Sequence, residues 1–251
     1  MKTIYSLTVM VAVLALLAFS VPVNAAGTDS RIESSAKQSY VFKTYLQGDD
    51  IKIESKDGAV TLTGMVLEES HKTLAQETVT NLPGVKSVNN KLEIKGTPPT
   101  ANSDAWLTTK VKTTLLFHRS VSAGKTEVDV KDGIVTLRGN VANQAQKDLT
   151  TEYAKDIEGV KDVKNELTVT NVPKTKRTTG EKIDDSSITA QVKMTLLYHR
   201  STSAINTKVV TKGGVVTMTG KANSVAEFNL ATKLASDVNG VKSVNNRMSV
   251  E

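Results

Sequence analysis

The sequence predicts an α+β protein built from three tandem αββαβ units, each a mixed three-stranded sheet with two helices on one face. The first observation is a short motif that occurs as DGAVTLTG, DGIVTLRG and GGVVTMTG. The second is GVKSVNNKLEI, which recurs as GVKDVKNELTV and GVKSVNNRMSV. Both motifs recur at offsets of 75 and then 81 residues. Equal offsets for two separate motifs indicate one structural unit present three times.

We place unit 1 at residues 30–95, unit 2 at 104–170 and unit 3 at 185–251. The connecting segments, residues 96–103 and 171–184, are polar and contain prolines, which is typical of exposed linkers. The second linker is also basic. Its basic side chains are Lys174, Lys176, Arg177 and Lys182.

Unit 2 has the clearest pattern for the first helix. Leu107, Val111 and Leu115 repeat every fourth residue behind the capping residue Ser103, which predicts an amphipathic helix over residues 104–118. The equivalent apolar stripes are Ile32, Ala36 and Tyr40 in unit 1, and Ile188, Val192 and Leu196 in unit 3.

The rest of the unit follows from alternation and turn signals. Alternating valines, the turn at Asp132 and Gly133, and the run IVTLRG predict a β-hairpin. A second helix with an apolar face around Tyr153 ends at Gly159, and a final alternating strand follows. Since a strand-helix-strand connection is parallel and right-handed, the sheet is mixed.

Glycines and asparagines recur at equivalent turns and strand positions, where we expect structural roles. An amide beside a turn can bond to backbone groups, and a glycine there tolerates unusual backbone angles. These residues are Gly58, Gly64, Gly84 and Asn90 in unit 1, Gly133, Gly139, Gly159 and Asn165 in unit 2, and Gly214, Gly220, Gly240 and Asn246 in unit 3.

This order of a helix, a DGxVTLxG hairpin, a second helix and a GVxxVxN strand start resembles the BON domain, named for bacterial osmotically induced and nodulation proteins. The resemblance covers nearly all of the chain after the first 30 residues. It implies a non-catalytic exported protein that binds phospholipid or other envelope components in osmotic or envelope stress protection. An alternative is a periplasmic stress chaperone or scaffold for protein clients. Exported members typically have two units, and Gly213 replaces the hairpin aspartate in unit 3.

The first 25 residues predict a cleaved secretory signal peptide. Lys2 is followed by an uncharged apolar run, Pro22 and a small-residue sequence. The run is short for a membrane-spanning helix and is soon followed by this cleavage signal. We expect cleavage after Ala25 or Ala26 and a periplasmic product.

Charge and composition narrow the classes of partner. The chain has no cysteine and three histidines, so we expect no metal site. No nucleophile, acid-base pair or metal-ligand set recurs or converges, so we expect no catalytic residues and no cofactor. The excess positive charge lies in the basic linker and unit 3, where residues 184–251 hold eight basic and five acidic groups. An anionic membrane surface or envelope component is therefore the expected partner, with protein clients as the alternative. An exported protein rarely meets nucleic acid, so we expect no nucleic-acid binding.

The motif LLFHRS recurs as LLYHRS at the end of the first helix in units 2 and 3. Unit 1 has Lys43 at the histidine position, so one interpretation is a positive group at a helix C-terminus, which the helix dipole favours. The other is binding of an anionic head group beside exposed aromatic rings. For Trp106, packing between units 1 and 2 is an equal alternative. The candidate binding residues are Trp106, Lys110, Phe117, His118, Arg119, Lys193, Tyr198, His199 and Arg200.

Overall fold

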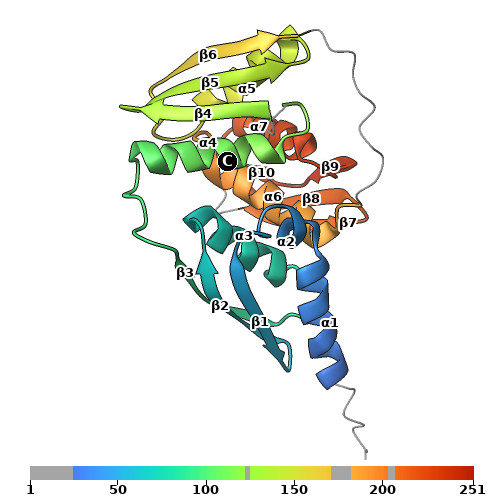
Figure 1. Ribbon diagram of the computed structural model, residues 1–251. Coiled ribbons are helices and arrows are strands. Elements are labelled where there is room, and N and C mark those ends of the chain that lie inside the picture. Colours follow the sequence, from blue (N-terminus) through green and yellow to red (C-terminus); the bar gives the residue numbers. More distant parts are fainter. Residues whose placement is uncertain (1–24, 122–124, 171–181, 203–206) are drawn as a thin grey trace, which may run out of the picture.

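The computed structural model confirms the α+β class and the three mixed sheets (Figure 1). The described residues are 25–121, 125–170, 182–202 and 207–251. The predicted signal peptide falls almost entirely outside them, as do Lys174, Lys176 and Arg177.

Each unit runs helix, strand, strand, helix, strand, with two departures described below. Unit 1 consists of α1 (Ala25–Gln38), α2 (Tyr40–Thr44), β1 (Asp50–Lys56), β2 (Ala59–Val66), α3 (Glu69–Thr80) and β3 (Ser87–Ile94). Unit 2 consists of α4 (Asp104–Phe117), β4 (Thr126–Lys131), β5 (Ile134–Val141), α5 (Gln144–Lys155) and β6 (Asp162–Val169). Unit 3 consists of α6 (Asp185–Tyr198), β7 (Thr207–Lys212), β8 (Val215–Ala222), α7 (Val225–Asp237), β9 (Ser243–Asn246) and β10 (Ser249–Val250).

In every sheet the second strand is central. It pairs antiparallel with the first strand through the hairpin and parallel with the last strand, across the second helix. The helices cover one face of each sheet, and alternate strand residues such as Val60, Leu62 and Leu92 are buried beneath them. The opposite face is exposed. In unit 3 the last strand is interrupted between β9 and β10.

The first helix of unit 1 is broken at Ser39, where we expected one continuous stripe. Ser39 has an extended backbone with φ −61° and ψ 152°, and its hydroxyl caps α2 by accepting from the amide of Phe42. The break brings Val41, which is fully buried, into the core, whereas Tyr40 is half-buried. It also directs two backbone amides towards unit 3: Tyr40 N donates to Asp184 and Val41 N donates to Ser187.

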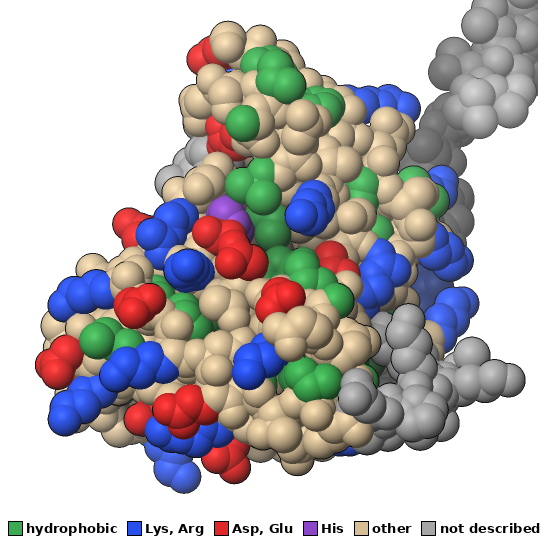
Figure 2. Space-filling view, turned by 90° about the horizontal axis from the view of Figure 1, so that it is seen from above, with side chains coloured by type: hydrophobic (Ala, Val, Ile, Leu, Met, Phe, Trp, Pro, Cys, Tyr) green, Lys and Arg blue, Asp and Glu red, His purple; other side chains and the backbone are tan. Residues whose placement is uncertain are grey.

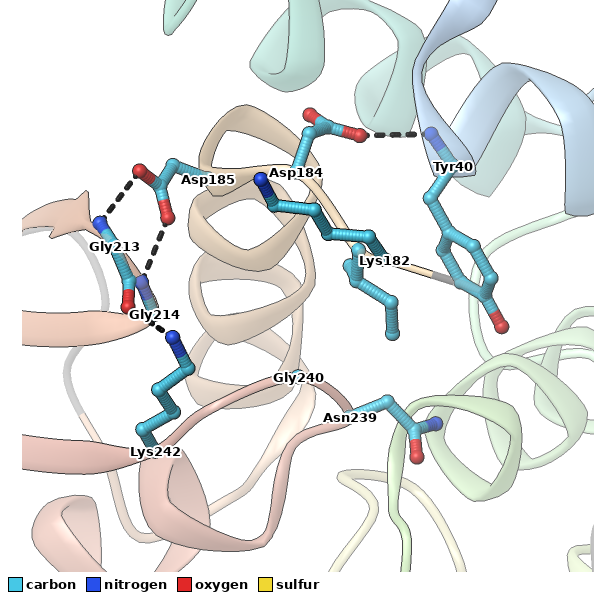
Figure 3. A pocket seen from close by; sticks show the side chains of 10 residues that line it. Tyr40, Lys182, Asp184, Asp185, Gly213, Gly214, Asn239, Gly240 and Lys242 are labelled. Carbon is cyan, nitrogen blue, oxygen red and sulfur yellow. Dashed lines mark hydrogen bonds between the residues drawn. The ribbon is translucent and has the colours of Figure 1, made fainter. Parts of the chain in front are cut away.

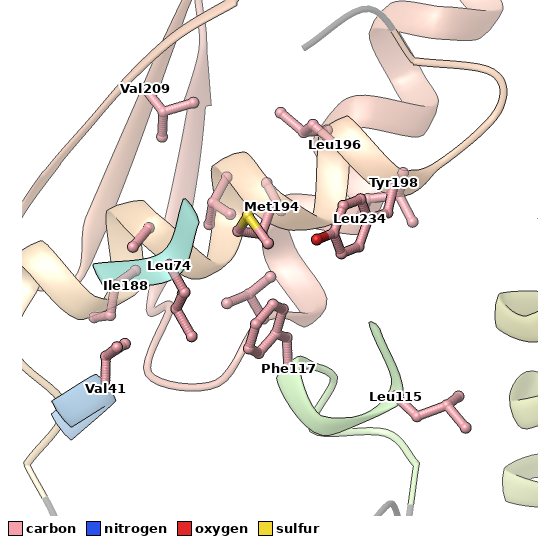
Figure 4. Packing of buried hydrophobic residues seen from close by; sticks show 14 of the residues in the cluster. Val41, Leu74, Leu115, Phe117, Ile188, Met194, Leu196, Tyr198, Val209 and Leu234 are labelled. Carbon is pink, nitrogen blue, oxygen red and sulfur yellow. The ribbon is translucent and has the colours of Figure 1, made fainter. Parts of the chain in front are cut away.

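The three units pack through their helices. The sheets lie towards the outside and α2, α3, α4 and α6 meet between them (Figure 1). Their contact forms one apolar cluster that draws residues from all three units: Val41 and Leu74 from unit 1, Phe117 from unit 2, and Ile188 and Met194 from unit 3 (Figure 4). The helix faces that look available in the isolated repeat are therefore largely buried against neighbouring units.

Candidate functional site

The repeated histidine-arginine pairs meet at a contact between units 2 and 3. His118 follows α4 and forms an antiparallel bridge with Val238 at the end of α7, whereas His199 follows α6 and forms the same bridge with Ile157 at the end of α5. The backbone amide of Arg119 donates to the carbonyl oxygen of Asp237, and that of Arg200 donates to the carbonyl oxygen of Asp156, each at 2.9 Å. We call this two-fold contact the reciprocal interface. Its residues are His118, Arg119, Ser120, Tyr153, Asp156, Ile157, Val160, His199, Arg200, Asp237, Val238 and Val241.

Asp237 is the centre of one half of the reciprocal interface. It accepts a hydrogen bond of 2.7 Å from the Tyr153 hydroxyl and another from Ser120. The His118 ring stacks on Tyr153 with 3.8 Å between centroids, and its Nδ1 lies 3.3 Å from the Asp237 carboxylate. Burial alone would raise the pKa of Asp237, but the nearby His118 ring and the hydrogen bonds from Ser120 and Tyr153 lower it. The ionised carboxylate is therefore the stable form.

The other half of the interface is built around Arg200. Its guanidinium donates to the carbonyl oxygens of Lys155, at the C-terminal end of α5, and of Ile157 and Val160, in the turn that follows. A cation suits this position because helix carbonyls carry partial negative charge. His199 Nε2 lies 3.1 Å from Asp156. Arg119 makes a corresponding bond to the carbonyl of Val241 and lies 3.7 Å from Asp237.

The structure corrects the expectation that these aromatic and histidine side chains face an anionic surface. A side chain must be exposed to contact a lipid head group. Four of the nine candidate residues are buried, namely Phe117, His118, Tyr198 and His199. Arg119 and Arg200 bond across the reciprocal interface, so reversing their charge would lower thermal stability.

The remaining candidates also lie at contacts between units. Lys193 of unit 3 forms an ion pair of 2.6 Å with Glu77 of unit 1. The Lys110 ammonium lies 3.7 Å from the Trp106 ring centroid and 4.8 Å from that of Tyr198 in unit 3. Burial lowers the pKa of Lys110, against the opposing effect of Glu158. Through Lys110, Trp106 joins a contact between units 2 and 3, whereas the sequence suggested lipid or unit 1.

The recurrent asparagines bind the last strand to the second helix of their own unit. Each side chain donates to a helix carbonyl, that of Lys72 for Asn90, Lys147 for Asn165 and Phe228 for Asn246. Each also accepts from the amide two residues further along the strand. The recurrent asparagines therefore have a structural role: they fasten the last strand of each unit to its second helix.

Sequence reasoning missed a third recurrent group, the aspartates in or at the start of each first helix. Asp104 accepts from the amides of Asp132 and Gly133 at 2.7 and 2.8 Å, which fastens the hairpin turn to the helix. Asp29 and Asp185 do the same in units 1 and 3. These aspartates are spaced by the same 75 and 81 residues as the motifs, a signal that could have identified them.

A hollow of about 870 Å³ lies beside the start of α6 (Figure 3). It is lined by the hairpin turn and last-strand turn of unit 3 together with Tyr40 of unit 1. Asp184, Asp185 and Lys242 all point to backbone groups with which they form hydrogen bonds. These three charged side chains therefore stabilise the fold.

The protein shifts the pKa values of His199 and His71 in opposite directions. Burial lowers the pKa of His199, despite the raising effect of Asp156, with Arg200 and His118 lowering it further. His71 is partly buried between Asp49 at 2.7 Å and Glu68 at 3.1 Å. Burial opposes its protonation, but the two carboxylates outweigh burial and raise its pKa.

We therefore expect the two histidines to affect acid stability with opposite signs. Because the pKa of His199 is lowered by folding, its contribution to stability is present above the unfolded pKa of about 6.5 and is lost as the pH falls through the folded pKa. Because the pKa of His71 is raised by folding, its contribution is present below about 6.5 and is lost as the pH rises through the folded pKa. Urea midpoints between pH 8 and 5 should fall less on acidification in His199→Gln than in the parent protein, and more in His71→Gln. Parallel curves for all three proteins would contradict this assignment.

The repeated sheets, turns and helix contacts define a tandem-repeat protein of small α+β domains. The chain belongs to the BON domain family: the family model matches residues 28–96, 103–171 and 184–251. This confirms the family resemblance and the three copies.

Two curated relatives indicate the kind of BON protein that the chain is similar to. Osmotically-inducible protein Y of Escherichia coli is 32% identical over 143 residues, which cover 55% of this chain and 71% of that protein. Outer membrane lipoprotein DolP of Haemophilus influenzae is 34% identical over 149 residues, 59% of this chain and 75% of that protein. The chain is thus similar to proteins of osmotic stress and of the cell envelope.

A solved structure of CdsD, a structural protein of the type III secretion system of Chlamydia trachomatis, is 16% identical over 88% of this chain and 90% of its own, with a TM-score of 0.25. This low score supports no conclusion. In the described part of the chain, no helix is long and apolar enough to span a membrane. The same residues contain no cluster of three or more potential metal ligands.

Proposed function

We propose that this chain is a non-catalytic exported protein of the cell envelope that binds anionic phospholipid or another anionic envelope component. It acts in osmotic or envelope stress protection, and it is located in the periplasm after loss of the signal peptide. The names of its two relatives, an osmotically inducible protein and an outer membrane lipoprotein, support this direction.

The main observation in support of the proposal is that most acidic side chains of unit 3 accept hydrogen bonds from other parts of the protein. Residues 184–251 contain eight basic and five acidic groups. Four of the acidic groups accept hydrogen bonds within the fold or across a contact between units; they are Asp184, Asp185, Glu227 and Asp237. Two of the eight basic groups, Lys193 and Arg200, are likewise held at contacts between units. The other six basic groups are exposed, as is Glu251, so the outer surface of unit 3 is rich in cations.

The arrangement of the polar side chains supports a binding role over catalysis. Two histidine-carboxylate pairs, His118 with Asp237 and His199 with Asp156, lie at a contact between units, where their side chains hold the two units together. Ser120 donates to the same carboxylate as His118 approaches, which orders the contact and does not prepare a nucleophile.

Sedimentation with vesicles tests the proposal. The purified protein should sediment with vesicles containing phosphatidylglycerol, remain in the supernatant with vesicles of phosphatidylcholine alone, and dissociate as salt rises, because the attraction between exposed charges is screened. Equal binding to the two kinds of vesicle, or none to either, would refute binding to anionic lipid.

The alternative, a periplasmic chaperone or scaffold for protein clients, makes a different prediction. Such a protein should suppress aggregation of an unfolded client without sedimenting with anionic vesicles. Running both assays on one preparation therefore separates the two functions.

A further inference from the structure

The outer face of the sheet in unit 3 differs in charge from those of units 1 and 2. Pairing places Lys208 opposite Thr219, Val210 opposite Thr217 and Lys212 opposite Val215, so these side chains share the face turned away from the helices. Lys221 follows on β8, and Arg247 is exposed between β9 and β10. We call this surface the basic sheet face; its residues are Lys208, Val210, Lys212, Val215, Lys221 and Arg247.

The basic sheet face combines cations with exposed apolar groups. Val210 is 49% exposed and Val215 is 40% exposed, and they lie diagonally across neighbouring strands. Lys208 and Lys212 flank Val210 along β7, about 13 Å apart at the usual rise of a strand. No acidic residue occurs within β7, β8, β9 or β10. The neighbouring acid, the terminal Glu251, pairs with Lys221.

The same positions in units 1 and 2 have mixed charge. Unit 2 has Glu127 where unit 3 has Lys208, Asp129 where unit 3 has Val210, and Glu166 where unit 3 has Arg247. Unit 1 has Glu54 at the position of Val210. All four of these acidic residues are exposed. The molecular face in Figure 2 likewise has acidic and basic side chains next to one another.

We propose that the basic sheet face is the surface that docks on an anionic phospholipid bilayer, an inference that rests on the proposed function and assigns its site. A sheet face presents its cations side by side to an extended anionic plane, and each near-surface Lys or Arg strengthens such binding. The exposed valines add contact with the apolar boundary below the head groups, which a soluble polyanion does not provide.

Charge reversal at matched positions tests this assignment. Lys208→Glu with Arg247→Glu introduces the side chains that unit 2 carries at these positions, so the fold accommodates them. Lys52→Glu with Lys91→Glu makes the same change of net charge at the same positions in unit 1. We expect the unit 3 variant to lose about 30-fold in affinity for phosphatidylglycerol-containing vesicles, and the unit 1 variant to change less than about 3-fold.

The results for the two variants and the parent protein distinguish an error in the proposed site from an error in the proposed function. Equal losses in the two variants would mean that net charge drives binding, and no loss in either would place the site elsewhere; both results overturn the inference and leave the proposed function standing. No vesicle binding by the parent protein would overturn both. Unchanged circular dichroism and thermal midpoints in the two variants are the control for folding.

A second variant tests the choice of a bilayer over a soluble polyanion. Val210→Thr with Val215→Thr keeps the shape and branching of both side chains and all of the charge. Vesicle affinity should fall several-fold, whereas binding to soluble polyphosphate should be unchanged. If vesicle affinity is also unchanged, the valines make no apolar contact and the bilayer assignment is wrong.

Discussion

Gly139→Ala should lower the free energy of unfolding by about 4 kcal/mol or more, the largest effect that we expect of a single substitution in this chain. Gly139 lies in β5 with φ +125°, a region that side chains rarely adopt. A β-carbon there would lie 2.0 Å from the carbonyl oxygen of Lys125. That atom belongs to the backbone, so the clash can be relieved only by separating β4 from β5. Urea denaturation followed by circular dichroism measures the loss.

Gly213→Asp is the matched control for this prediction. Gly213 also has a left-handed backbone, with φ +60°, but nothing lies within 4 Å of its β-carbon position. Asp57 and Asp132 already occupy the equivalent turn position with φ 54°. The substitution should therefore cost about 1 kcal/mol. If Gly139→Ala proves as mild, close approach of the backbone is not the reason for glycine in β5.

Local patterns predicted the elements of each unit because they depend on near neighbours in sequence. The stripe of Leu107, Val111 and Leu115 specifies a helix face that is buried by its own sheet, and all three residues are buried. The turn at Asp132 and Gly133 requires left-handed backbone angles, which the structure shows at φ 54° and 80°. The α+β class and the mixed sheet follow from such signals.

The break at Ser39 was not predictable in the same way. The unit 1 stripe continues to Tyr40, and Ser39 is compatible with either a helix interior or a cap. The break is stabilised from outside the unit, where Asp184 and Ser187 accept from the two amides that it frees. These partners are 144 and 146 residues away.

The burial of the histidine-arginine pairs was missed for the same reason, although the sequence contained a signal for it. Units 2 and 3 have His118 and His199 after the first helix and Asp156 and Asp237 at the end of the second. Unit 1 lacks both partners: Lys43 replaces the histidine, and at the aspartate position stands an asparagine. Two residue types that occur together and are missing together indicate a contact, here one between units.

Asp237→Ala should lower the free energy of unfolding by about 3 kcal/mol, because it removes the centre of one half of the reciprocal interface. The Tyr153 and Ser120 hydroxyls would each lose their acceptor, and the buried His118 ring would lose the nearby carboxylate. Denaturant unfolding at pH 7 measures the loss. In the Asp237→Ala background, Tyr153→Phe should cost little more, since the hydroxyl is already without its partner.

Asp156→Ala, at the equivalent position of unit 2, is the matched control and should cost about 1 kcal/mol or less. Its side chain is 40% exposed against 14% for Asp237, so solvent screens it more. The two halves also differ in chemistry, because unit 3 has Leu234 where unit 2 has Tyr153, and a leucine cannot donate to Asp156. Equal costs for the two alanine variants would show that the tyrosine-aspartate bond adds nothing. A larger cost for Asp237 would show that the contact between units 2 and 3 depends mainly on the half with the tyrosine.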